Sequence, residues 1–95
     1  MLIETPIKDG DVITIKTSAG DEVVAVLEKE TDSHLTVKKP MAIMASGQGL
    51  GLGPFVFTVN PDTRINISKS AIVFFAKTDG EMAKQYISSS TGITV

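Results

Sequence analysis

Two short polar segments hold most of the side chains in this chain that could bind another molecule. The first is Asp32-Ser33-His34-Leu35-Thr36, a turn that leads into an apolar strand and is followed by Lys38. A neutral imidazole has a flat face on which a base can stack, and such stacking is worth about 1–3 kcal/mol per base. Thr36 is expected on the same face as His34 because strand side chains alternate, and its hydroxyl can donate or accept a hydrogen bond. These residue types are suited to holding a nucleic-acid base.

The second segment is Lys69-Ser70-Ala71-Ile72, a turn preceded by Ser68 and followed by an apolar strand. Lys69 and either Lys38 or Lys39 would contact phosphate groups, and one lysine per subunit becomes a circle of positive charge when copies surround an axis. Each residue also has an ordinary interpretation, as a solvent-exposed histidine or lysine, a β-forming threonine, or a turn-shaping aspartate. The candidate nucleic-acid-binding residues are Asp32, His34, Thr36, Lys38, Ser68, Lys69 and Ser70.

Catalysis is not expected from this composition. One histidine and no cysteine leave few nucleophile–base pairs, and no spacing of ligands indicates a metal site. Residues 46–53, SGQGLGLG, lack the Gly-Lys-Ser/Thr ending of a phosphate-binding loop and its strand-to-helix setting. We therefore predict no catalytic residue, no metal and no cofactor. We also predict a flexible glycine-rich hairpin loop, with Leu50 and Leu52 at a tip that could contact a neighbouring chain.

Length and composition indicate one small globular domain over residues 1–95. Hydrophobic residues make up 42% of the chain and charged residues 21%. No apolar run approaches the ~20 residues of a membrane span, and the first residues do not resemble a secretory signal. We expect a cytoplasmic protein, in the host-cell cytoplasm if its source is viral, with no membrane partner. The net charge of −2 argues against strong non-specific binding to duplex DNA but allows a local basic patch.

The elements that position the two polar segments follow from the hydrophobic pattern. A period of two, rich in β-branched residues, predicts strands at residues 12–17, 22–31, 34–45, 55–59 and 71–76, with further extended chain at 64–67. Pro40 should lie at a bend or an edge because it cannot donate to a ladder. A helix is predicted at about residues 80–89, with Asp79 as its N-cap, Met82 and Tyr86 on its apolar side, and a loose tail from Ser88.

Five strands joined mostly by short turns predict an all-β fold, a small, strongly bent antiparallel barrel over about residues 10–77 with a short C-terminal helix. The strands at 22–31 and 71–76 are apolar on both faces, whereas a small antiparallel sheet normally exposes one face to water. We interpret the second apolar face as a subunit interface. The alternative is that the C-terminal helix of the same chain covers it.

A bent five-stranded meander with polar turns after its second and fourth strands resembles the Sm-like family, which includes the bacterial RNA chaperone Hfq. The similarity covers residues 10–77. The first family motif reads Asp, any residue, an aromatic or His, an apolar residue and Asn, and it matches residues 32–36 except that Thr36 replaces Asn. The bacterial second motif, Lys-His-Ala-Ile, matches residues 69–72 except that Ser70 replaces His, and the Arg-Gly of other members is absent. These departures indicate a divergent member, for which a phage is one candidate source.

The resemblance implies a ring of identical subunits in which the last strand of each pairs with the fourth strand of its neighbour. It implies that single-stranded, uridine-rich RNA binds around the central pore. His34 would stack on a base, position 36 would bond the base edge, and Asp32 would position residue 36. We thus expect a homo-oligomer that binds single-stranded RNA or DNA in RNA processing or regulation. The expected interface residues are Phe55, Phe57, Ile72 and Phe74.

A second hypothesis is a structural or protein-interaction module on the same barrel, for instance a viral assembly component that binds no nucleic acid. The acidic balance, the departures from both motifs and the apolar loop tip favour it. The position of the lysines separates the two hypotheses, since convergence of lysines near His34 favours nucleic acid.

Overall fold

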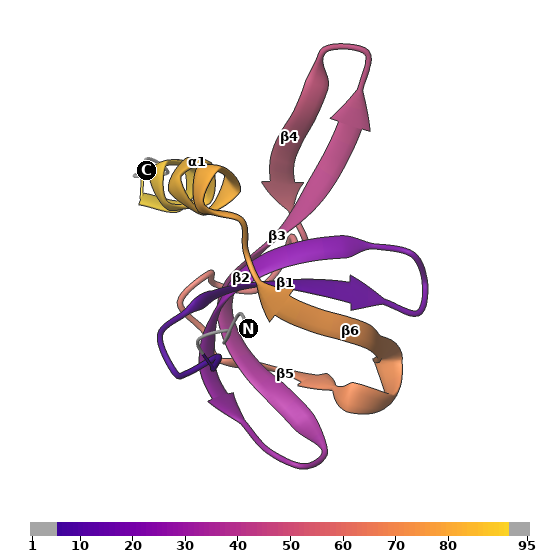
Figure 1. Cartoon of the computed structure of the whole chain (residues 1–95), viewed down its shortest axis with the longest axis vertical. Coiled ribbons are helices and arrows are strands. Elements are labelled where there is room, and N and C mark those ends of the chain that lie inside the picture. The colour runs from indigo at the N-terminus through magenta and orange to yellow at the C-terminus, as the bar shows by residue number, and fades with distance from the viewer. Residues whose placement is uncertain (1–5, 92–95) are drawn as a thin grey trace, which may run out of the picture.

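The computed structural model describes residues 6–91, which form a six-stranded antiparallel sheet and one C-terminal helix (Figure 1). An all-β fold with a short C-terminal helix is therefore confirmed. A 3₁₀ turn, η1 (Lys69–Ala71), joins the last two strands. The elements are β1 (Val12–Thr17), β2 (Glu22–Glu30), β3 (His34–Ser46), β4 (Gly49–Pro54), β5 (Ile65–Ser68), β6 (Ile72–Lys77) and α1 (Gly80–Thr91).

The strands are ordered β4-β3-β2-β1-β6, and β5 adds to β3 beside this path. The long strand β3 has two partners along the same edge. Its first half, residues 34–37, pairs with β5, and residues 41–46 pair with β4. The β3–β4 hairpin projects from the rest of the sheet (Figure 1). Among the described residues the ladders do not close on themselves, because β5 and β6 are joined through η1 but pair with different strands. The closed barrel stays a prediction.

A bend at Lys39 and Pro40 separates the two halves of β3. The register with β2 shifts here, since Val24 faces Met41 but Val26 faces Lys38. Lys39 has a φ of 52°, in the left-handed region that side chains other than glycine rarely adopt. A bulge of this kind bends a strand and increases its twist. The predicted bend at Pro40 is thus confirmed.

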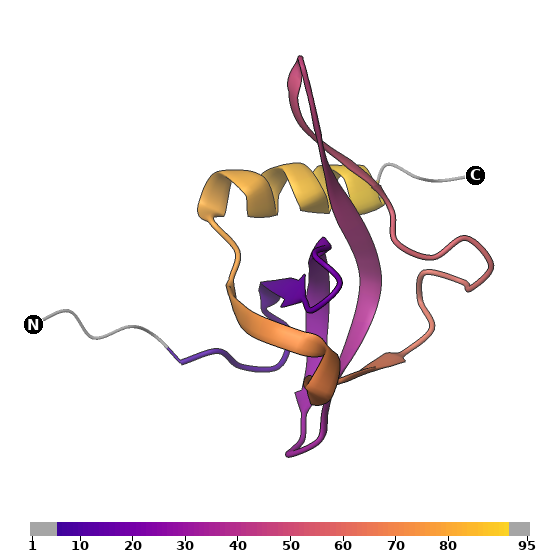
Figure 2. The same cartoon turned by 90° about the vertical axis from the view of Figure 1, so that its right-hand side faces the viewer.

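The core lies between the inward faces of the strands. Its buried members alternate along β1, β2 and β3, as the period of two predicted, and they are Ile13, Ile15, Val23, Ala25, Leu27, Leu35 and Val37. A second buried cluster on the other face of the sheet contains Val24, Met41 and Tyr86. Tyr86 of α1 is 0% exposed, and its hydroxyl donates to the carbonyl oxygen of Lys39 at 2.7 Å. Figure 2 shows the helix lying across the sheet beside β3.

The second apolar face, predicted for both β2 and β6, is covered on one of these strands and exposed on the other. On β2 the helix covers it, which is the alternative that the sequence left open. On β6 it stays exposed, with Val73 65% and Phe74 54% accessible. Of these two strands, only β6 therefore keeps an uncovered apolar face.

The sheet has six strands where five were predicted, and two segments differ from the sequence prediction. Residues 55–59 do not form a strand, and the glycine-rich segment predicted as a loop forms β4 instead. At Gly53 the end of the Met44 side chain lies where a Cβ would be, so a larger residue there would require that side chain to move. Leu52 packs on the second buried cluster, so of the two predicted tip residues only Leu50 is exposed.

The helix is longer than predicted. It extends to Thr91, past the predicted end near residue 89, and so includes the start of the tail that was expected to be loose from Ser88. Asp79 caps the helix as predicted, since its carboxylate accepts the backbone N–H groups of Glu81 and Met82. Buried Tyr86 then anchors the middle of the helix. The rest of the predicted tail lies outside the described residues. No helix in residues 6–91 has the length and hydropathy needed to cross a membrane.

Candidate functional site

The two polar segments of the sequence lie side by side in the structure. In the β3–β5 ladder His34 faces Ser68, and Thr36 faces Asn66. The backbone N–H of Lys69 donates to the carbonyl oxygen of Ser33 at 2.8 Å and ties η1 to the turn before β3. Residues far apart in the chain thus form one polar surface. We call it the β3–β5 face, made of residues 31–34, 36, 38, 66 and 68–70.

Alternation along both strands explains which side chains reach this face. Leu35 and Val37 belong to the buried core, and Ile65 and Ile67 pack against it. The residues between them therefore point to the opposite face, and directly opposed residues of an antiparallel pair share a face. The local pattern Ile-Asn-Ile-Ser in β5 is what brings an amide and a hydroxyl beside the first residues of β3.

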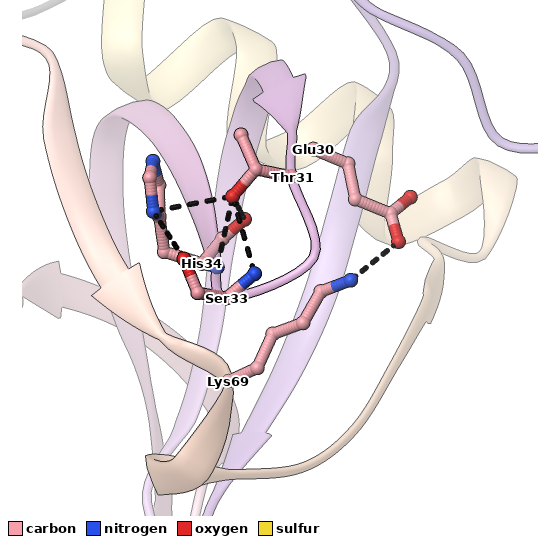
Figure 3. A network of polar contacts seen from close by, with 5 residues as sticks. All are labelled: Glu30, Thr31, Ser33, His34 and Lys69. Carbon is pink, nitrogen blue, oxygen red and sulfur yellow. Dashed lines mark hydrogen bonds and ion pairs between the residues drawn. The ribbon is translucent and has the colours of Figure 1, made fainter.

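A network of hydroxyl groups holds one edge of the His34 ring (Figure 3). Thr31 Oγ1 accepts the backbone N–H groups of Ser33 (3.3 Å) and His34 (3.1 Å), and it donates to the His34 carbonyl oxygen (3.2 Å). Nδ1 of His34 lies 3.2 Å from both Thr31 Oγ1 and Ser33 Oγ. Nε2, at the other end of the ring, has no hydrogen-bond partner among residues 6–91. The imidazole is therefore oriented from one side and open on the other.

Thr36 and Asn66 form the next rung of this face. The Thr36 side chain is almost buried, at 9% exposure, and its hydroxyl donates to Oδ1 of Asn66 at 2.7 Å. Asn66 itself is exposed. The sequence prediction included Thr36 but missed Asn66, although its place between two apolar strand residues marks it as outward-facing.

Ser68 and Ser70 shape the turn that carries Lys69. Ser68 Oγ accepts the backbone N–H of Ser70 at 3.3 Å, and the two hydroxyl oxygens lie 2.8 Å apart. A serine that caps a helical turn in this way satisfies a backbone donor that would otherwise lack a partner. Both predicted serines are thus used in forming η1.

The cations of the face are paired with acids of β2. Lys69 Nζ lies 2.8 Å from Glu30 Oε2, and Glu28 Oε1 lies 3.7 Å from Lys38 Nζ and 3.3 Å from Arg64 Nε. Exposed ion pairs contribute only about 0–1 kcal/mol, so a phosphate could replace these carboxylates at little cost. Lys38 shares the face of His34, since the two are four residues apart on β3. The ammonium of Lys69 instead lies beside Glu30, which is opposite the core residue Leu35 in the β2–β3 ladder, so Lys69 borders this face.

The remaining charged candidates lie apart from these pairs. Asp32 is exposed in the turn and has no partner among the described residues. Lys39 lies away from the face, beside Asp62 at 3.8 Å. No three His, Cys, Asp or Glu side chains of residues 6–91 gather in a way that could hold a metal ion.

The four residues predicted for an interface have different surroundings. Phe55 and Ile72 pack against the core of their own chain. Phe57 is 84% exposed and Phe74 lies on the exposed side of β6. Only β1 pairs with β6 in the described part of the chain, so the other backbone edge of β6 is open. A groove of about 350 Å³ along this strand is lined by Lys69, Ile72, Val73, Phe74 and Phe75. The β3–β5 face and the open edge therefore meet at Lys69.

Compared with known proteins, the chain matches no family model, and no curated protein is similar enough in sequence to count as a match.

Proposed function

We propose that this chain is a divergent Sm-like protein whose copies assemble into a ring and bind single-stranded nucleic acid, RNA in the first place, on the β3–β5 face. The observation that carries the proposal is the contact between the two polar segments. The backbone N–H of Lys69 donates to the carbonyl oxygen of Ser33, and Ser68 is opposite His34 in the β3–β5 ladder. The imidazole of His34, the hydroxyl and amide groups beside it and the cation of Lys38 then share one face, and Lys69 borders it. Single-stranded nucleic acid, with its exposed base faces and its phosphates, matches this combination.

A single copy of this face would bind weakly. One stacked base contributes about 1–3 kcal/mol, and the lysines must first leave their carboxylate partners. Several copies of the face in one assembly would bind more tightly, because each additional contact along one strand of RNA is made at a high effective concentration. The function therefore depends on an oligomer whose faces surround a common axis.

Two features support such a ring. The open edge of β6 carries exposed Val73 and Phe74, and exposed strand edges readily add a strand from another chain. The sheet is also strongly curled, since β6 at one end of the strand order and β5, which pairs with β3 near the other end, are linked by the three residues of η1. The Sm-like barrel belongs to this proposal, with β6 of one copy pairing with an open strand edge of the next.

One observation favours a second candidate, a protein-interaction module. Residues 40–61 contain no charged side chain, and Phe57 in this segment is 84% exposed. The segment borders an apolar groove of about 700 Å³ between the β3 bend and the end of α1. In this case the partner is a protein, and changes on the β3–β5 face leave its binding unaltered.

Sedimentation of the full chain combined with filter binding tests the first proposal. The ligands are oligouridine, oligoadenosine and single-stranded DNA at low salt. We expect an oligomer that retains RNA, and we expect His34→Ala and Lys69→Ala to weaken retention. Lys84→Ala is the matched control, because it removes an exposed lysine from α1, away from the face. An intact oligomer that retains no oligonucleotide overturns the proposal and leaves the protein-interaction module.

A further inference from the structure

The β3–β5 face presents an exposed carboxamide that a nearly buried hydroxyl holds in one orientation. The hydroxyl of Thr36 has one hydrogen-bond partner among residues 6–91, which is Oδ1 of Asn66 at 2.7 Å. If the amide were turned over, Nδ2 would donate to Thr36 and the hydroxyl proton would have no acceptor. An unsatisfied buried donor is unfavourable, so the orientation with Oδ1 toward Thr36 is the stable one.

The two N–H groups on Nδ2 of Asn66 are therefore directed away from Thr36, and they have no partner within residues 6–91. Asn66 is exposed, so a ligand on this face can reach them. A carboxamide normally offers a donor and an acceptor side by side, which is how asparagine recognises adenine. Here Thr36 occupies the acceptor, and only the donors face outward.

The Asn66 donors lie near the His34 ring, at the next pair of residues that faces the same side of the β3–β5 ladder. His34 and Thr36 are two residues apart on one strand and share a face, which corresponds to a separation of about 7 Å. Asn66 is directly opposite Thr36. A base that stacks on the imidazole can thus extend its edge toward Nδ2 of Asn66.

We propose that Asn66 is a specificity-determining residue for this surface, that Thr36 is its positioning residue, and that the pair selects bases with a keto oxygen facing Nδ2. This inference rests on the proposed function. Uracil and hypoxanthine carry such an oxygen. Cytosine and adenine carry an amino group in the same place, and that group would meet the Asn66 donors with its own N–H.

Matched pairs of short single-stranded oligonucleotides test the inference, because each pair differs only in a keto or an amino group. The first pair is oligouridine against oligocytidine, and the second is oligoinosine against oligoadenosine. We expect the full-length protein to bind the keto member of each pair about tenfold more tightly. Asn66→Asp keeps the acceptor toward Thr36 but removes both donors, so its preference should vanish.

Two variants test the positioning role of Thr36. Thr36→Val removes the hydroxyl at nearly constant shape, and we expect the keto preference to fall at least threefold. Thr36→Ser keeps the hydroxyl and should keep the keto preference. It therefore tests the role of the hydroxyl even if the Thr36→Val variant folds poorly. In the absence of RNA, the side-chain amide resonances of Asn66 should shift in Thr36→Val and not in Thr36→Ser.

The possible outcomes separate this inference from the function on which it rests. If the wild-type oligomer binds none of the oligonucleotides, the proposed function fails. If it binds keto and amino members equally, or if Asn66→Asp keeps the wild-type ratio, RNA binding stands and the role of Asn66 is overturned. A Thr36→Val variant with unchanged amide resonances overturns the positioning role alone.

Discussion

The ammonium group of Lys69 lies 2.8 Å from a carboxylate oxygen of Glu30, so a cation that we propose for phosphate contact has an anionic partner in the free protein (Figure 3). Both side chains are partly exposed, and both lie beside the turn that carries His34. The ion pair holds the lysine in place but competes with a phosphate group for it. This competition leads to the first prediction.

Glu30→Gln should increase affinity for single-stranded RNA at low salt, because Lys69 no longer has to leave a carboxylate. Exposed ion pairs are worth about 0–1 kcal/mol, so the gain is at most about fivefold per site. Filter binding over a series of salt concentrations measures it. Glu22→Gln is the control, since it removes the same charge from an exposed position at the start of β2. Equal effects of both changes would mean that only net charge matters and that Lys69 has no special role.

Tyr86 should make the protein less stable in alkali. Burial raises the pKa of its hydroxyl from 10.0 to about 12, and a backbone hydrogen bond at Val26 lowers it only in part. The unfolded chain therefore loses the phenolic proton first as pH rises. The contribution of Tyr86 to stability is fully present below pH 10 and is lost progressively toward pH 12. Two pKa units correspond to a decline of about 2–3 kcal/mol.

Urea unfolding from neutral pH to pH 12 measures this decline. The Tyr86→Phe variant isolates it from the titration of lysines, because the chain has a single tyrosine. The variant should lose about 1–2 kcal/mol at neutral pH, since the carbonyl oxygen of Lys39 loses its partner, but its stability should fall less in alkali. Tyrosinate absorbance of the folded wild type should rise near pH 12. A rise centred at pH 10 would show that the hydroxyl is not buried in solution.

Lys39→Gly should stabilise the fold. The φ of 52° at Lys39 is strained for a residue with a Cβ and is accessible to glycine. The lost pair with exposed Asp62 contributes little. After the entropy cost of glycine in the unfolded chain, we expect a gain of about 0.5–1 kcal/mol in the free energy of unfolding. Lys38→Gly, one residue away in ordinary strand conformation, should destabilise the fold. A loss in both variants would argue against strain at the bend.

Local sequence patterns predicted the elements whose side chains show a hydrophobic period or a capping residue. Residues 12–17, the strand starting at residue 22 and the helix with its Asp79 cap follow from periodicity and capping. The strand β4 could not be found in this way, because its alternating glycines leave no side-chain pattern and its existence depends on backbone pairing with β3. Residues 55–59 have the period of a strand, but Phe55 packs on the core without entering a ladder.

The candidate site was only partly predictable for a related reason. The types of residue in each polar segment were visible, as was the shared face of His34 and Thr36. The pairing of Thr36 with Asn66 depends on the register between two strands that are distant in the chain, and that register is set by long-range packing. A shift of one residue would turn Asn66 into the core and remove it from the face.

Phe74→Lys should dissociate the proposed ring into single chains. Phe74 lies on the strand whose outer backbone edge is open, and a lysine on an edge strand discourages the addition of another strand. We expect sedimentation at micromolar concentration to change from oligomer to single chains. RNA retention should fall far more than any change on one face could explain, because the contacts are no longer repeated around an axis.

Leu50→Lys is the matched control for this experiment, since it also places a lysine at an exposed apolar residue, but at the tip of the β3–β4 hairpin. Assembly through β6 leaves this variant oligomeric and able to bind RNA. If Leu50→Lys dissociates the oligomer while Phe74→Lys does not, the hairpin is the assembly element and the proposed pairing of β6 with a neighbour is wrong. The uncharged segment at residues 40–61 would then be the surface on which copies meet.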